Sequence, residues 1–101
     1  MRKTIQVTNL VGIRFHPRVV AERGVWCLHK GIGSDQGYTV THTPTLLAAI
    51  KGVRTVREGR DAMRELVTIP GDWSFTVEEG MSKRQKRAGK RIARKYQVAE
   101  E

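Results

Sequence analysis

The strongest constraint on the fold is a pair of short alternating runs, Gly24–Lys30 and Gly37–Thr43, on either side of a loop. The loop, Gly31–Gln36, combines glycine, serine and aspartate, which are typical of turns. Two such runs predict an antiparallel hairpin. The expected register pairs Lys30 with Tyr38, Leu28 with Val40, and Trp26 with His42. It gathers apolar side chains on one face of the sheet: Trp26, Leu28, Tyr38 and Val40.

Three further segments have the features of strands. Polar and apolar residues alternate within Lys3–Thr8 and again within Ile13–His16, where Pro17 interrupts the pattern. Leu46–Ile50 is expected to add a strand to the hairpin, because its neighbours form a meander. A helix from Leu46 through Lys51 fits the same residues almost as well and remains open.

The segment after Thr55 has the periodicity of an amphipathic helix. Thr55 followed three residues later by Glu58 is a capping-box pattern, which marks the start of a helix. One face is apolar and is expected to pack on the sheet: Val56, Gly59, Ala62, Met63, Leu66 and Val67. The other face interleaves arginines with acids that are expected to pair with them: Arg57, Arg60 and Arg64 with Glu58, Asp61 and Glu65. A ridge of these arginines on nucleic acid is the alternative interpretation.

The chain is expected to leave this helix at Ile69–Asp72, and Trp73 and Phe75 then form a short strand or an aromatic plug. Together these elements predict an α+β fold, a small antiparallel β-meander packed on one amphipathic helix and followed by a basic C-terminal helix. Residues 1–80 form the body, and residues 81–101 form the basic helix and tail, as one domain with an extension. The expected core joins both layers: Trp26, Leu28, Val40, Met63, Leu66 and one of Trp73 or Phe75.

The segment from Met81 to Tyr96 contains eight lysines and arginines and no acid. The whole chain has a formal net charge of +9, yet residues 1–80 hold 11 Lys and Arg against 8 Asp and Glu. Ser82 followed by Gln85 is a second capping-box pattern. At about 100° per residue, the cations share an arc of roughly 180°: Lys83, Arg84, Lys86, Arg87, Lys90, Arg91, Arg94 and Lys95. A narrow stripe occupies the opposite side: Met81, Gln85, Ala88, Ile92, Tyr96 and Ala99.

A helix with one cationic half is suited to lie along a polyanion, because phosphate contacts give affinity without a sequence requirement. The sequence therefore predicts a small basic protein that binds DNA or RNA, mainly through the phosphate backbone. A solvated tail is the alternative, although such a tail does not need its charges sorted onto one face. The chain lacks the aromatic residues of an RNA-recognition motif, a zinc finger and a recognisable helix-turn-helix, so direct base reading is not expected.

Other functional classes remain open. An adaptor or inhibitor, for example of a mobile element, would dock its α+β body on a protein partner and place the basic helix in an acidic or nucleic-acid-occupied channel. A ribonucleoprotein component would thread that helix between RNA segments. The expected topology over residues 24–67 also resembles small sheet-plus-helix DNA-binding domains that place a sheet in the major groove. That resemblance implies a set of groove-facing residues: Lys30, His29, Thr39 and Thr41.

Motifs for catalysis are not found, since the chain has no Walker loop, nucleophile elbow or paired-cysteine zinc signature. Cys27 and His29 share a strand face, but His42 is expected on the other face, and a structural zinc needs four ligands. We therefore expect a protein that is not an enzyme, with no catalytic residue, metal or cofactor. The single cysteine suits a reducing cytoplasm, in which a nucleoid or ribonucleoprotein association is compatible. Neither a membrane span nor a signal peptide is recognised, so a soluble protein with no membrane partner is expected.

Overall fold

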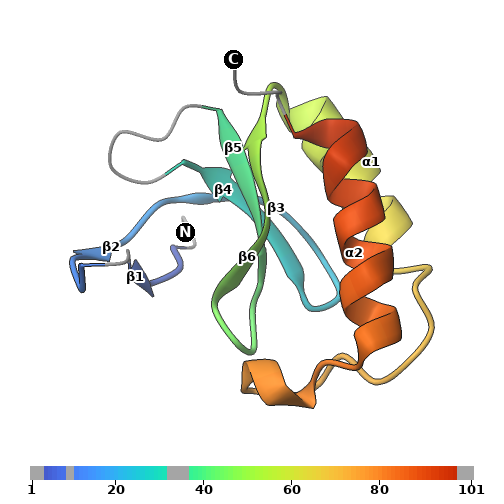
Figure 1. Ribbon diagram of the computed structural model, residues 1–101. Helices are drawn as coiled ribbons and strands as arrows, with labels where there is room; N and C mark the ends of the chain where they lie inside the picture. Colours follow the sequence, from blue (N-terminus) through green and yellow to red (C-terminus); the bar gives the residue numbers. More distant parts are fainter. Residues whose placement is uncertain (1–3, 9–10, 32–36, 98–101) are drawn as a thin grey trace.

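The fold is centred on a four-stranded antiparallel sheet in the order β3-β4-β5-β6. The structure is a computed structural model, and it describes residues 4–8, 11–31 and 37–97. The strands of this sheet are β3 (Val19–Arg23), β4 (Trp26–Lys30), β5 (Tyr38–His42) and β6 (Leu47–Val53). Two helices lie on one side of the sheet, as Figure 1 shows, and the N-terminal strands lie away from them. The expected α+β class is therefore confirmed.

The predicted hairpin is present with the predicted register. Strands β4 and β5 pair with Lys30 opposite Tyr38, Leu28 opposite Val40 and Trp26 opposite His42. Leu28 and Val40 are both fully buried, at 0% exposure, in the core between the sheet and the helices. Alternation along the two strands was therefore a sufficient guide to the face that each side chain occupies.

The open alternative at Leu46–Ile50 is resolved in favour of a strand, which extends beyond the expected segment to Val53. Strand β6 pairs with β5, and its Ile50 and Val53 enter the core. The sequence did not predict β3, which pairs with β4 on the other side of the hairpin. Its burial pattern is weak, because only Val19 and Ala21 are partly buried and the remaining residues are exposed.

The other face of the sheet is covered by the N-terminal segment. Strands β1 (Val7–Thr8) and β2 (Arg14–Phe15) form a separate antiparallel pair, in two of the segments expected to contain strands. Ile5 and Val7 pack with Cys27 in a second, smaller apolar cluster, against which Phe15 is partly buried. Both faces of β4 are therefore covered, which explains why its residues from Trp26 to His29 are all buried.

Helix α1 (Val56–Leu66) begins where the capping pattern predicted, since the Glu58 amide donates to Thr55 Oγ1 at 3.1 Å. Its core-facing residues are buried: Gly59, Ala62, Met63 and Leu66. Val67 was expected on the same face, but it is the C-terminal cap of the helix and is 43% exposed. At about 100° per residue, Val67 falls outside the arc that the four buried residues occupy, so the core covers its side chain only in part.

Trp73 and Phe75 form the aromatic plug rather than a strand. Trp73 meets Trp26 edge to face with ring centroids 5.0 Å apart, and Phe75 stacks on His42 at 4.7 Å. Trp73 also donates from its indole nitrogen to the Ile69 carbonyl oxygen at 3.2 Å. Trp73 packs against the main core, which contains all of the aliphatic residues that were expected there.

Helix α2 (Lys83–Tyr96) follows a short 3₁₀ turn, η1 (Glu78–Gly80). It contacts both α1 and β6, so the two helices form one layer over the sheet (Figure 1). Ile92 and Ala93 on its inner side belong to the main core. After the helix, Gln97 forms an antiparallel bridge with Val53 at the end of β6. The basic segment is thus built into the same core as the sheet.

Candidate nucleic-acid interface

The cationic half of α2 faces solvent over its whole length. All eight predicted contact residues are exposed: Lys83, Arg84, Lys86, Arg87, Lys90, Arg91, Arg94 and Lys95. We call this set the cationic face. On the opposite side, Gln85 and Ile92 are buried, and Met81, Ala88 and Tyr96 are partly buried. Ala99, which was expected on that stripe, lies outside the described residues. The helix is therefore amphipathic in the sense that the sequence predicted.

Gln85 fixes the start of α2 on the body. Its side-chain oxygen accepts from the Ser82 amide at 2.8 Å, and the Gln85 amide donates to Ser82 Oγ at 3.1 Å, which completes the capping box. The side-chain nitrogen of the same residue donates to the Asp72 carbonyl oxygen at 2.8 Å. Gln85 is 4% exposed, so one buried side chain both caps the helix and joins it to the preceding loop.

Glu65 of α1 fixes the other end of α2. Its carboxylate accepts from Lys95 Nζ at 2.6 Å and from the Tyr96 hydroxyl. Two hydrogen bonds lower the pKa of Glu65, and the one from Lys95 has a larger effect than the one from Tyr96. The same contact with Glu65 raises the pKa of Tyr96 to about 12. We call this three-residue contact the helix clamp.

The helix clamp divides the cationic face into two parts. Lys95 is paired with Glu65, although its side chain remains 59% exposed. Within residues 4–8, 11–31 and 37–97, no acid forms an ion pair with the other seven cations. Those seven side chains are held at fixed spacing on an anchored helix and remain available to an external anion.

The arginine ridge of α1 is the alternative interface, and it differs from the cationic face because acids lie among its arginines. Arg57, Arg60 and Arg64 are exposed, but Arg64 lies 3.6 Å from Asp61 in an ion pair. The predicted pairing of acids with arginines on this helix therefore holds for Asp61. Glu65 instead pairs across to α2. A polyanion on α1 would meet acids among the arginines, whereas the cationic face of α2 contains none.

The residues that the groove-binding resemblance implied are not on a free surface, which contradicts that interpretation. His29, Thr39 and Thr41 are 1%, 5% and 1% exposed. His29 Nε2 accepts from Thr41 Oγ1 at 2.7 Å, and its Nδ1 donates to the Lys30 carbonyl oxygen at 2.8 Å. The N-terminal segment contributes the apolar cluster on this face, so the sheet cannot present these side chains to a DNA groove. Lys30 alone of the set is exposed.

The three residues that were considered as zinc ligands have structural roles: Cys27, His29 and His42. Cys27 is buried, and His42 lies on the other face of the sheet, as the register predicted. His42 donates from Nε2 to the Trp73 carbonyl oxygen at 2.7 Å and accepts at Nδ1 from the Thr45 hydroxyl at 2.8 Å. Burial lowers the pKa of both histidines. Among the residues that the structure describes, no three His, Cys, Asp or Glu side chains gather in a way that could hold a metal ion.

In the described part of the chain, no helix combines the length and the apolar character needed to cross a membrane. Comparison of the chain with models of protein families, with curated proteins and with solved structures finds no match.

Proposed function

We propose that this protein binds nucleic acid through the phosphate backbone, and that α2 supplies the contacts. The observation that carries this proposal is the division of α2 into a buried side and a cationic face with seven unpaired cations among the described residues. A helix whose inner side is needed by the core has no structural reason to place only cations outside. Each lysine or arginine that neutralises a phosphate releases condensed counterions, which favours binding.

The spacing of the cations suits a continuous array of phosphates. Lys83, Arg87, Lys90 and Arg94 recur at helical intervals and form a row along the outermost line of α2. At a rise of 1.5 Å per residue, this row is about 16 Å long. Duplex DNA carries one charge in about every 1.7 Å of its axis, so several phosphates lie within reach of the row.

This mode of binding is independent of sequence. Contacts with phosphates position a protein on the nucleic acid but do not distinguish one base from another. We therefore expect similar affinity for duplexes of different sequence. The chain has a single cysteine, Cys27, which is compatible with action in a reducing cytoplasm.

The test is charge reversal on α2 with a matched control on α1. Arg87→Glu with Arg91→Glu should weaken binding to duplex DNA by about tenfold or more at low salt, because two contacts become repulsive. Arg57→Glu with Arg60→Glu changes the net charge by the same amount on the other exposed helix and should have a much smaller effect. Anisotropy of a fluorescent duplex measures both affinities.

Two outcomes would contradict the proposal. Equal losses for the two variants would mean that net charge, and not α2, determines binding. Weak binding of the wild-type chain to any free nucleic acid, together with a stoichiometric protein partner that survives nuclease treatment, would favour the adaptor or inhibitor class instead.

A further inference from the structure

A hollow of about 590 Å³ opens on the surface between the start of β3, the end of β4 and the start of β5. Helix α2 contributes none of its lining residues. The volume of the hollow lies in the range of about 300–1,000 Å³ that is typical of small-molecule sites. This hollow is therefore a second candidate site, separate from the cationic face.

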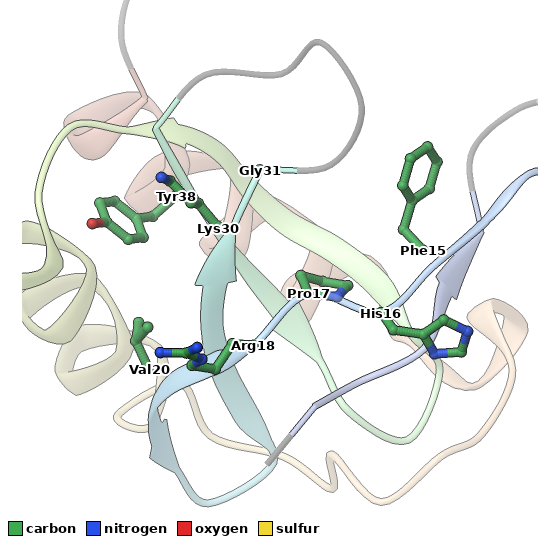
Figure 2. A pocket seen from close by; sticks show the side chains of 8 residues that line it. All are labelled: Phe15, His16, Pro17, Arg18, Val20, Lys30, Gly31 and Tyr38. Atoms are coloured by element: carbon green, nitrogen blue, oxygen red, sulfur yellow. The ribbon is translucent and has the colours of Figure 1, made fainter. Parts of the chain in front are cut away.

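The side chains around the hollow fall into two groups, as Figure 2 shows. Arg18, Val20, Lys30 and Tyr38 lie toward one side, whereas Phe15 and His16 lie toward the other, beyond Pro17. Lys30 and Tyr38 are direct partners across β4 and β5, so their side chains belong to the same face of the sheet.

The first group, of four residues, combines two cations with apolar and aromatic surface. Arg18 and Lys30 are exposed, and in the described part of the chain neither pairs with an acid. Val20 is 37% exposed, and Tyr38 is partly buried because it also packs against the main core. No acidic side chain is among the described residues that line the hollow. The ligand that fits this set has a planar apolar part and a negative charge.

Hydrogen bonds and packing hold the backbone around the hollow in place. The Lys30 carbonyl oxygen accepts from His29 Nδ1, which is itself held by buried Thr41. Arg18 stands next to β3 and forms a backbone bridge with Thr4. Tyr38 packs against the main core, which limits the motion of its ring. Such preorganisation reduces the entropy lost on binding.

We propose that these four residues, which we call the nucleotide pocket, bind a nucleotide. The base would lie against the Tyr38 ring and the Val20 side chain, and the phosphate would lie on Arg18 and Lys30. Bases stack on aromatic side chains without strong sequence preference, and cations beside the ring hold the backbone. A base within a duplex is already stacked and paired, so the pocket takes a free nucleotide or an unpaired residue of a single strand. This function differs from the proposed contact of α2 with duplex phosphates.

The first experiment is an NMR titration of the full ¹⁵N-labelled chain with adenosine monophosphate, with inorganic phosphate and with a short single strand of DNA. Adenosine monophosphate should shift the amide signals of Val20, Lys30 and Tyr38, and inorganic phosphate should shift Tyr38 much less. If the strand binds the same pocket more tightly than adenosine monophosphate does, the source of the ligand is single-stranded nucleic acid. If the two bind with equal affinity, the ligand is the free nucleotide. Shifts confined to α2 would overturn the pocket while leaving the proposed function intact.

The second experiment measures adenosine monophosphate affinity by calorimetry for variants of the pocket. Tyr38→Leu should weaken binding by about five- to hundredfold, because base stacking is lost, whereas Tyr38→Phe should keep the wild-type affinity. Arg18→Gln with Lys30→Gln changes exposed side chains and should weaken binding without loss of fold. The control, Arg23→Gln with Lys51→Gln, removes the same charge from exposed residues that do not line the hollow. Equal affinities for the wild type, Tyr38→Leu and the Arg18 and Lys30 variant would overturn the proposal.

Discussion

Gly59 allows α1 to approach the sheet closely, and this contact gives a sharp test of the helix-on-sheet packing. A Cβ atom at Gly59 would lie 2.5 Å and 2.6 Å from the two Cδ atoms of Leu28 and 3.1 Å from its Cγ. Leu28 is fully buried at 0% exposure, so its side chain could move away from the new methyl group only by rearranging within the core. Gly59→Ala should therefore strain the contact between α1 and β4.

The expected magnitude follows from two opposing effects. Alanine in a helix interior is about 1 kcal/mol more favourable than glycine. Overpacking of a dense core usually costs about 1–3 kcal/mol, and the short distances to Leu28 place this site at the upper end. The net result is a loss of about 2 kcal/mol in the free energy of unfolding. For a chain of this size, the melting temperature should fall by roughly 10 °C.

Gly89 in α2 provides the matched control, because a Cβ there would have no atom within 4 Å beyond its own surroundings. Gly89→Ala should stabilise the protein by about 0.5–1 kcal/mol through helix propensity alone. Urea unfolding monitored by circular dichroism measures both variants. Stabilisation of similar size in the two variants would refute the close packing of α1 on Leu28.

Three further predictions test the core, the helix clamp and the buried histidines. Leu66→Ala should lower the free energy of unfolding by about 2–5 kcal/mol, since Leu66 is fully buried; an unchanged urea midpoint would contradict the predicted core. Glu65→Gln should cost about 1 kcal/mol, because Tyr96 loses its carboxylate acceptor; an unaltered Tyr96 titration in this variant would rule out the helix clamp. Burial lowers the pKa of His29 and His42 below the ordinary value of 6.5, so the unfolded chain takes up protons first as the pH falls. Stability measured in urea should therefore decrease below about pH 6.5, and a constant value down to about pH 5 would contradict neutral buried histidines.

The local pattern was sufficient to predict most of the secondary structure. Alternation in β4 and β5 determined their register, and the residues Ser82 and Gln85 marked the start of α2. Each of these features depends on residues close together in the chain or on one short hairpin. Such signals are readable because their physical cause, side-chain direction or capping, is local.

The missed features depend on contacts between distant segments. Strand β3 has little alternation, and it is recognisable only once β4 offers it a partner. The burial of His29 and Thr41 required a second layer from the N-terminal segment, which the hairpin pattern alone does not reveal. The nucleotide pocket likewise joins Arg18 to Lys30 and Tyr38 through the fold.

For the cationic face, the sequence predicted which side chains would be exposed but not what each would contact. All eight cations face solvent, as the helical arc indicated. Lys95 could not be separated from the others by the sequence, because its partner Glu65 lies on another helix. The acid that pairs with Lys95 was expected to pair with an arginine on its own helix.

The salt dependence of duplex binding tests the central claim most directly. If about five cations of α2 contact phosphates, the slope of log affinity against log salt concentration should be about −4 to −5 on duplex DNA. The Arg87→Glu and Arg91→Glu variant should flatten that slope by about 2. A slope near zero, or a slope unchanged by the reversal of charge on α2, would contradict binding of nucleic-acid phosphates by the cationic face.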